Sequence, residues 1–558
     1  MASLTPVAKG LIAVAIVAVS GAAAWHLGVK NLFGTQTLVT PVAAAGTPVA
    51  PPPAVSPSPN GPLPQGDGPI GGEKNPLKVS IVSFHGYAPA IVANGKSLKT
   101  QPDSIYAGVG ANIEFVIQDD IPPLATIFGS NTGHCAWRTS DFWAQEQPNL
   151  RNAGYDGRAV MIVDNTQGGD AIIAKDPAIQ KVEDLVGKKV ALLQFTPSHG
   201  LIIDALENSS LTPRKRESVK MVYINADEGT AGVRAAFISG NVDAAVLWDP
   251  DLALAIKQGS AHVVYSTKTA TNLIFDVMVC DSRVLADASG RAAVQKFVDG
   301  WMKGVAKSKA EPELAIDALI ETEQFFSLLA KDEGRPFVKS LFDNILWTGV
   351  ADNARILGLV GGTNHYGRVY KRFDEIYRAV GALANPKSPV IDPGDSIDTS
   401  FIAALLETAA GAKVEAAKPQ FTFDDKGRDA AGKKAALLTK PVTVSFAPGS
   451  QELTKRAQKT IDTDMVPLIE NNGAAYFEIS GNTDSTGSAA ANKALSKQRA
   501  DAVVKYLVTQ WEFPKQRFTV VGNGSSEPLC DEAKPDEGMT LDQCRESNRS
   551  TRLAILSR

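Results

Sequence analysis

Two charged residues near the C-terminus have the types and the spacing to bind a zwitterion. Asp484 lies in a polar turn, and Arg499 lies on the helix that is predicted to follow it. A carboxylate binds an ammonium group, and a guanidinium binds a carboxylate through two parallel hydrogen bonds. Together they would hold a ligand that carries both groups. The alternative is an internal salt bridge between Asp484 and Arg499, since a charge beside a buried stripe needs a partner.

A strand and a helix must position this pair. Apolar and polar residues alternate over 475–479, which predicts a strand that breaks at Gly481. The candidate N-caps of the helix after the turn are Ser485, Thr486 and Ser488. The expected buried stripe of that helix is Leu495, Ala502, Val503, Tyr506 and Leu507.

The motif around the pair resembles the OmpA-like peptidoglycan-binding domain. The resemblance rests on TDSTG at 483–487, Asn492 and LSKQRA at 495–500. It implies an α+β domain over 441–558 in which Asp484 and Arg499 hold the diaminopimelate of the cell-wall peptide. The further peptidoglycan-binding residues that it implies are Thr483, Asn492, Arg549 and Arg552. The family's terminal Asn-Arg-Arg motif is loosened here over 548–552, and Asn482 replaces its usual aromatic or His residue.

The composition indicates several domains and gives no sign of nucleic-acid binding. The chain has 558 residues, of which 44% are hydrophobic and 21% charged, and its formal net charge is −4. An apolar segment at 11–29 predicts either a transmembrane anchor over 10–30, with a cytoplasmic N-terminus at 1–9, or a cleaved signal peptide. The anchor is favoured. Flagellar stators of the MotB type share this layout, but the segment lacks their intramembrane Asp.

The middle of the chain alternates short strands with helices. A Pro/Ala-rich linker is expected over 31–74 and a second linker over 388–440. Between them the pattern predicts an α/β fold with mainly parallel sheets. The expected strands are 77–83, 112–117, 159–164, 170–174, 189–194, 220–225, 244–248, 262–265 and 274–280. The expected helices include 200–208, 229–239 and 292–307.

Three segments resemble the periplasmic solute-binding proteins of ABC transporters in the nitrate/sulfonate/taurine and thiamine-precursor class. They are GYAP at 86–89, EDLVGKKV at 183–190 with FTPSH at 195–199, and AAFISGNVDAAVLWDP at 235–250. The resemblance implies a two-lobed, class II-like periplasmic-binding-protein fold over 75–387. Lobe one would hold 75 to about 164 and about 274 onward, and lobe two would hold about 165–271. Some relatives use this fold as enzymes of pyrimidine synthesis.

The expected ligand residues stand where strands end and helices begin, or in the first of these segments. Thr196 and Ser198 at such a junction make an anion-receptive corner, although they also qualify as ordinary caps. Aromatic walls with a few polar groups are typical of small-ligand clefts. The candidate ligand-binding residues are Tyr87, Trp137, Thr139, Asp141, Thr196, Ser198, His199, Trp248 and Asp249.

No enzyme motif, metal-ligand spacing or phosphate loop is found, and no cofactor is expected. His134, Cys135 and Asp141 are close in sequence but give only a weak nucleophile set. Cys530 and Cys544 bracket a polar loop, so a disulfide is predicted in the oxidising compartment. Cys135 and Cys280 are a second candidate pair within lobe one.

These features predict an inner-membrane protein with a single transmembrane helix and its bulk in the periplasm of a Gram-negative-type bacterium. It would bind a small anionic or zwitterionic solute and attach noncovalently to peptidoglycan, with an ABC permease as a further partner. The alternative is a structural envelope tether whose solute-binding-like domain is degenerate and serves protein contacts.

Overall fold

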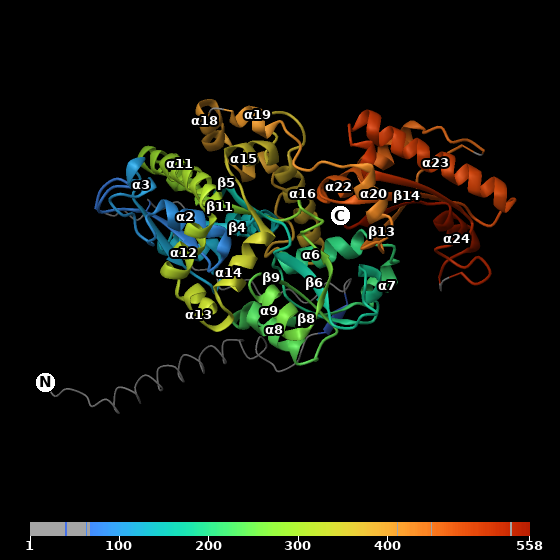
Figure 1. Ribbon diagram of the computed structural model, residues 1–558, viewed down its shortest axis with the longest axis horizontal. Helices are drawn as coiled ribbons and strands as arrows, with labels where there is room; N and C mark the ends of the chain where they lie inside the picture. The colour runs from blue at the N-terminus through green and yellow to red at the C-terminus, as the bar shows by residue number, and fades with distance from the viewer. Residues whose placement is uncertain (1–38, 42–62, 64–66, 410, 448, 536–537) are drawn as a thin grey trace.

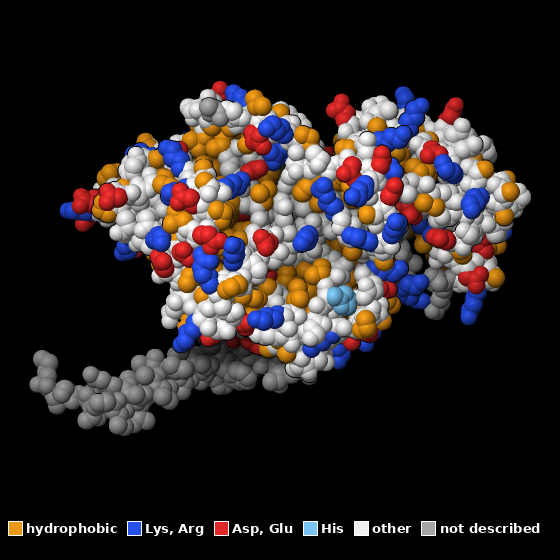
Figure 2. Space-filling view, viewed as in Figure 1, with side chains coloured by type: hydrophobic (Ala, Val, Ile, Leu, Met, Phe, Trp, Pro, Cys, Tyr) orange, Lys and Arg blue, Asp and Glu red, His pale blue; other side chains and the backbone are white. Residues whose placement is uncertain are grey.

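The computed structural model describes residues 39–41, 63, 67–409, 411–447, 449–535 and 538–558. Its strands form two six-stranded sheets in the middle of the chain and a four-stranded sheet at the C-terminal end. Figure 1 shows the C-terminal part, orange to red, beside the two lobes that hold the six-stranded sheets. Figure 2 shows acidic and basic side chains interspersed over this face of the molecule.

Lobe one is built on the sheet with strand order β12-β5-β11-β4-β2-β3. Its strands are β2 (Leu77–Ile81), β3 (Ile113–Ile117), β4 (Cys135–Thr139), β5 (Gly157–Thr166), β11 (Phe275–Asp281) and β12 (Ile345–Trp347). The helical elements that accompany it are η2 (His85–Tyr87), α2 (Ala88–Ala93), α3 (Ile105–Gly108), α4 (Leu124–Ser130), α5 (Ser140–Asn152), α10 (Ser282–Ala286), α11 (Ala288–Ala310), α12 (Pro312–Thr322), α13 (Gln324–Glu333), α14 (Arg335–Leu341), η5 (Phe342–Asn344), α15 (Val350–Ile356) and α16 (His365–Ala379).

Lobe two is built on the sheet with order β1-β8-β7-β9-β6-β10. Its strands are β1 (Val39–Pro41), β6 (Asp170–Ala174), β7 (Lys189–Leu193), β8 (Lys220–Ile224), β9 (Ala244–Trp248) and β10 (His262–Ser266). Its helical elements are η3 (Val182–Leu185), α6 (Pro197–Glu207), α7 (Pro213–Glu217), η4 (Ala226–Glu228), α8 (Gly229–Ile238) and α9 (Asp251–Gly259).

Both lobe sheets are mixed, so the expectation of mainly parallel sheets is wrong. β2 is parallel to β3 and β4, and β7 is parallel to β8 and β9. In contrast, β11 is antiparallel to both β4 and β5, and β6 is antiparallel to both β9 and β10. The reason is the path of the chain. β5 leads out of lobe one and β11 brings the chain back, so the two cross the sheet in opposite directions.

The segment 388–440 is packed rather than extended, which corrects the expectation of a second linker. It contains α17 (Pro393–Ser396), α18 (Ser400–Thr408), α19 (Ala412–Ala416) and α20 (Asp425–Ala431). Phe401 and Ile402 of α18 are buried, and the Ser396 carbonyl accepts a hydrogen bond from the Trp143 indole at 3.0 Å. Buried apolar side chains in an Ala-rich segment therefore attach it to lobe one.

The C-terminal domain has the sheet order β13-β16-β14-β15. Its strands are β13 (Leu438–Val442), β14 (Tyr476–Asn482), β15 (Phe518–Gly524) and β16 (Thr551–Leu556). Its helical elements are α21 (Lys455–Thr460), η6 (Ile461–Met465), α22 (Val466–Asn471), α23 (Ala489–Gln510), η7 (Lys515–Arg517) and α24 (Leu541–Asn548). The first strand thus begins at Leu438, three positions before the expected boundary at 441.

Gly481 lies inside β14 and does not break it, which corrects a second expectation. A Cβ atom at Gly481 would stand 2.0 Å from the Ser496 carbonyl oxygen, so glycine lets α23 approach the sheet closely. The buried face of α23 is correspondingly small and polar at its N-terminal half. Its buried residues are Asn492, Ser496, Ala500, Val503, Val504 and Leu507. Leu495, Ala502 and Tyr506 from the expected stripe are only partly buried.

The C-terminal domain docks where the chain crosses between the lobes. Asn272 lies between β10 and β11, and its backbone N–H donates to the Asn471 carbonyl at 2.9 Å. The Tyr265 hydroxyl donates to Asn472 Oδ1 at 3.0 Å. Arg368 on α16 forms an ion pair with Glu470 on α22. The attachment therefore involves the hinge segment of the two-lobed domain.

Within the described residues, no helix is long and apolar enough to cross a bilayer. The apolar segment 11–29 lies outside the described residues, as does most of the expected linker 31–74.

Candidate functional sites

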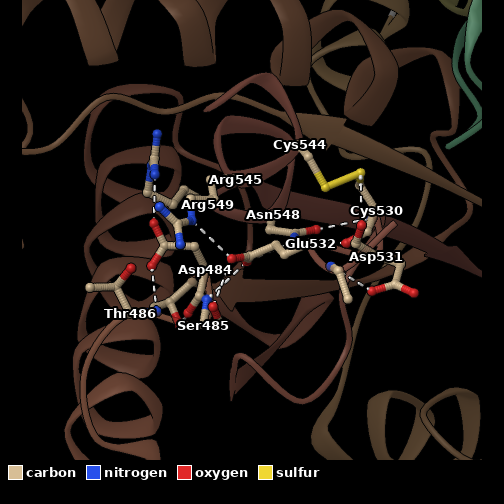
Figure 3. Close-up of polar contacts among 12 residues, drawn as sticks. Asp484, Ser485, Thr486, Cys530, Asp531, Glu532, Cys544, Arg545, Asn548 and Arg549 are labelled. Atoms are coloured by element: carbon tan, nitrogen blue, oxygen red, sulfur yellow. Dashed lines mark hydrogen bonds and ion pairs between the residues drawn. A yellow bond between two sulfur atoms is a disulfide. The ribbon is translucent and has the colours of Figure 1, made fainter. Parts of the chain in front are cut away.

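Asp484 lies in the loop between β14 and α23 and faces Arg549, the residue after α24 (Figure 3). Arg549 Nη1 donates to Asp484 Oδ2 at 2.5 Å, and the Thr486 backbone N–H donates to Oδ1 at 3.0 Å. Burial raises the pKa of Asp484, but these two hydrogen bonds outweigh burial and hold the pKa below its usual value. Asp484 is therefore an ionised carboxylate with one cationic partner.

Arg499 does not pair with Asp484, so the alternative of an internal salt bridge between these two residues is wrong. Its Nε donates to the Ser450 carbonyl at 3.1 Å, its Nη2 lies 3.4 Å from the Ala447 carbonyl, and its guanidinium lies 5.0 Å from the centre of the Phe446 ring. Burial lowers the pKa of Arg499, and the like charge of Arg549 lowers it further. Arg499 and Arg549 therefore lie close enough to repel each other, and the pairing goes to Arg549 because α24 ends opposite the Asp484 loop.

The other residues of the expected wall site are structural in their contacts. The Asn492 amide donates to the Thr486 carbonyl at 3.0 Å, and the Thr483 backbone N–H donates to the Gly524 carbonyl at 2.8 Å. Both contacts fix the loop that carries Asp484. Arg552 is buried on β16, and its guanidinium donates to the Glu527 carbonyl.

A neighbouring acidic residue, Glu532, was not predicted from the sequence. Its carboxylate accepts from the Ser485 hydroxyl at 2.7 Å, from Arg545 Nε at 3.0 Å and from the Asn548 amide at 3.1 Å. These hydrogen bonds, that from Ser485 first, lower the pKa of Glu532 to about 2. Cys530 and Cys544 form a disulfide beside this network, as Figure 3 shows. The disulfide and Glu532 together fix the loop against the Asp484 turn.

In the two-lobed part of the chain, Tyr377 of α16 connects the two lobes. Its hydroxyl lies 2.9 Å from the Thr196 carbonyl of lobe two and 3.5 Å from Asp141 Oδ2 of lobe one. Asp141 is in the first turn of α5, which Thr139 caps by accepting from the Phe142 N–H at 3.4 Å. Thr139, Asp141 and Thr196 therefore come together at the lobe junction.

Thr196 and Ser198 differ in what their hydroxyls do. The Thr196 hydroxyl donates to the Leu193 carbonyl at 2.8 Å and is occupied, whereas the Ser198 hydroxyl is buried without a partner. His199 is buried, and its Nδ1 accepts from the Phe195 N–H at 3.3 Å while its Nε2 lies 3.3 Å from the Tyr223 hydroxyl. Ser198 is thus the one member of this corner with a free polar atom.

The remaining expected ligand residues are spread over both lobes. Trp137 is buried in β4, Trp248 is half-buried at the end of β9, and Asp249 follows it with no exposed surface. Asp249 Oδ2 accepts from the Asn344 amide at 2.8 Å. The Tyr87 hydroxyl donates to Asp276 Oδ2 at 3.0 Å. Asp276 was missed from the sequence, as were Asp164 and Asp170. The available signal was an acidic residue at or near the first or last position of an apolar strand.

Cys135 is not available as a nucleophile. It forms a disulfide with Cys280, its register partner across β4 and β11. His134 accepts from the Lys78 N–H at 3.0 Å, and burial lowers its pKa to about 4. The described part of the chain holds no group of three or more His, Cys, Asp or Glu residues that could bind a metal ion.

Comparisons with known proteins match both parts of the chain. The sequence profile described as "NMT1/THI5 like" matches residues 148–315, and that of the OmpA family matches 445–539. An aliphatic sulfonates-binding protein of Escherichia coli K12 is 32% identical over 168 residues, which are 30% of this chain and 46% of the relative. A peptidoglycan-associated lipoprotein of Pseudomonas putida is 34% identical over 94 residues, which are 17% of this chain and 55% of the relative. The chain thus spans about half the length of these relatives.

Solved structures resemble the middle of the chain at low identity. The periplasmic aliphatic sulphonate binding protein SsuA of E. coli is 18% identical with a TM-score of 0.44, covering 59% of this chain and 98% of its own. The desulfurization enzyme DszB is 12% identical with a TM-score of 0.40, covering 59% and 99%. The chain carries an NMT1/THI5-like solute-binding domain, followed at its C-terminal end by an OmpA domain.

Proposed function

We propose that this protein is a membrane-anchored periplasmic protein that attaches noncovalently to peptidoglycan and binds a small solute between its two lobes. It acts without catalysis. The names of the two relatives, a sulfonates-binding protein and a peptidoglycan-associated lipoprotein, support the two activities. The apolar segment at 11–29 supports the anchor, and an ABC permease is the natural partner of such a domain.

The state of Arg499 carries the peptidoglycan proposal. Its hydrogen bonds go to two backbone carbonyls, and no carboxylate within the described residues forms an ion pair with it. A half-buried guanidinium is costly without an anion and retains donors for one. Asp484 is already neutralised by Arg549, so Asp484, Arg549 and Arg499 together carry one excess positive charge. A ligand carboxylate would balance it.

The remaining charges fit the ammonium end of the same ligand. Asp484 is ionised, and Arg549, which pairs with it, is about half-exposed, with 45% of its side chain accessible. Asp484 itself is buried, but because Arg549 keeps nearly half of its side chain in solvent, its guanidinium can move aside at a smaller cost than a buried partner could. The ligand ammonium would then share Asp484 while the ligand carboxylate binds Arg499. Diaminopimelate, with two amino acid ends, offers both groups.

The test is sedimentation of the full-length protein with purified sacculi. We expect the protein to pellet with sacculi and to be released by peptides that contain diaminopimelate, but not by peptides in which lysine replaces it. The lysine peptide lacks the second carboxylate that Arg499 would bind. Equal release by the two peptides would show that Arg499 does not bind that carboxylate.

The alternative, a tether with a degenerate solute domain, has one supporting observation. The OmpA domain contacts the hinge segment through Asn471 and Asn472, which would favour a fixed arrangement of the lobes. However, a degenerate cleft should have filled its buried polar positions, because unpaired buried polar atoms are costly. The Ser198 hydroxyl and both Asp164 carboxylate oxygens remain unpaired, which favours a working cleft.

A further inference from the structure

Acidic side chains gather where the two lobes meet. Asp164 near the end of β5 is the register partner of Asp276 at the start of β11, so both lie on one face of the lobe-one sheet. Asp170 opens β6 and Asp249 follows β9, and because these neighbouring strands are antiparallel, the two residues lie at the same end of the pair. All four are at most 4% exposed. The junction therefore buries carboxylates from both lobes.

These carboxylates have no cation among the described residues. Asp276 accepts from the Tyr87 hydroxyl and Asp249 from the Asn344 amide, whereas neither oxygen of Asp164 has any partner. Asp164 is close enough to Asp276 and Asp170 to be repelled by both. The guanidinium of Arg138 is bound by Glu146. Isolated buried carboxylates are strongly unfavourable, so a bound cation would stabilise this arrangement.

An aromatic group with an unused donor stands beside Asp164. Trp347 of β12 is the register partner of Asp164, is nine-tenths buried, and has an indole N–H without a partner. Phe342 packs against the Trp347 ring at 5.4 Å between centroids, and His85 packs against Phe342 at 5.5 Å. Both ring nitrogens of His85 also lack partners. Aromatic faces next to carboxylates are the environment in which proteins bind organic cations.

Gly86 leaves room for the Asp164 side chain because it has no Cβ atom. A Cβ atom at Gly86 would stand 2.0 Å from Asp164 Oδ2 and 2.7 Å from the Phe84 ring, so any other residue there would push one of these side chains aside. From lobe two, the buried Ser198 hydroxyl supplies one more unpaired polar atom. Unpaired polar atoms from both lobes are what a ligand at the junction would satisfy.

We propose that the cleft binds an organic cation, whose protonated amine, amidine or guanidine group is held by Asp164 and Asp276 beside the Trp347 ring. This rests on the proposed solute-binding function and narrows it, because it replaces the anionic or zwitterionic solute expected from the sequence with an organic cation. Since the described residues include no side-chain group arranged to hold a metal ion, an organic cation is favoured over a metal.

Thermal unfolding of the full-length protein, dialysed extensively, tests the charge of the ligand. The cationic probes are benzamidine, agmatine and choline, and the anionic probe is ethanesulfonate. We expect at least one cationic probe to raise the melting temperature by several degrees and ethanesulfonate to leave it unchanged. Magnesium chloride at equal ionic strength is the test for a metal ion, and we expect no shift from it.

Asp164→Asn removes the proposed partner of the cation. Without probe, and at a pH at which Asp164 and Asp276 are both ionised, this variant should unfold at a higher temperature than the wild type, because its amide carries no charge for Asp276 to repel. No cationic probe should shift its melting temperature. Asp299→Asn is the matched control, since Asp299 lies on α11 and pairs with Lys303 at 2.8 Å. It should keep the wild-type shifts. If Asp164→Asn does not fold, Asp276→Asn makes the same test.

Three results would overturn the inference. A shift with ethanesulfonate alone would leave solute binding standing but make the ligand an anion. A shift with magnesium alone, lost in Asp164→Asn, would make the ligand a metal ion. No shift with any probe would count against both the cation and the solute-binding proposal, while leaving attachment to peptidoglycan untouched.

Discussion

Asp484 of the OmpA domain and Asp164 of the solute-binding domain are carboxylates in opposite situations. Asp484 has an arginine partner at 2.5 Å and a backbone N–H, and its pKa is lowered. Asp164 is fully buried without any partner, and burial followed by the repulsion of Asp276 raises its pKa well above the usual value. The first site has an excess cation, Arg499, and the second has excess carboxylates.

The difference indicates what each site lacks. An excess guanidinium at a half-buried position needs an anion, whereas a set of buried carboxylates needs a cation or protons. The two halves of the protein are therefore expected to respond in opposite ways to neutralisation. Removing a charge from the wall site should reduce binding at little gain in stability. Removing one from the cleft should reduce binding and raise stability.

The largest expected effect is on the stability of the OmpA domain. Replacing Cys530 and Cys544 together by Ser opens a loop closed over a sequence separation of 14 and should cost about 3 kcal/mol. Because Glu532 lies in this loop, sacculus binding should weaken as well. Chemical unfolding and sedimentation of the double variant measure the two effects. Rapid thiol labelling of Cys530 and Cys544 in the native wild type would contradict the premise.

The pH dependence of the cleft should be the next largest effect. Burial first, offset in part by hydrogen bonds, raises the pKa of Asp249 to about 7 and that of Asp276 to about 7. Asp276 faces the Tyr87 hydroxyl and the carboxylates of Asp164, Asp141 and Asp170. Groups with raised folded pKa values stabilise the fold fully below their unfolded pKa, and this stability is lost as the pH rises through the folded value.

Histidines add an opposing effect in this range, because an unfolded histidine is still half protonated at about pH 6.5. Burial lowers the pKa values of His85, His134, His199 and His365, so these side chains are neutral in the folded state, and stability rises as they lose their protons in the unfolded state. This rise is the same in the wild type and in Asp276→Asn. We therefore expect the melting temperature of the ligand-free wild type, relative to that of Asp276→Asn, to fall by a few degrees from about pH 6.5 to about pH 8. A constant difference between the two proteins would place the titrating group elsewhere.

The smallest effect is expected from Ser198→Ala. Its hydroxyl is buried without a partner, so its loss should leave stability within about 1 kcal/mol of the wild type and weaken solute binding by a similar amount. Thr196→Ala is the contrast, since its hydroxyl bonds the Leu193 carbonyl. That variant should lose stability instead. Melting temperatures with and without a bound probe distinguish the effects of the two variants. Unchanged probe affinity in Ser198→Ala would show that the solute binds elsewhere.

The sequence predicted the OmpA domain because its motif is contiguous over 483–500, where local spacing carries the information. It did not predict the partner of Asp484, since Arg549 lies 65 positions away and is placed by tertiary packing. Gly481 was mistaken for a strand break. A glycine is needed there because α23 packs closely against the strand, and this tertiary contact cannot be seen in the sequence. Asp164 and Asp276 were missed because single acidic residues in apolar strands, AVMIVDNT and FDVMVCD, are brought together only by strand register.

Attachment to the cell wall through Arg499 is the central claim, and sedimentation of Arg499→Ala with sacculi tests it most directly. Losing a hydrogen bond to a charged group costs roughly 1.5–3 kcal/mol, which is about a tenfold to hundredfold loss of affinity. We expect most of the full-length variant to stay in the supernatant while its circular dichroism matches the wild type. Arg428→Ala is the control, because Arg428 pairs with Asp425 and Asp429 at the exposed surface of α20. Wild-type sedimentation by folded Arg499→Ala would contradict the account.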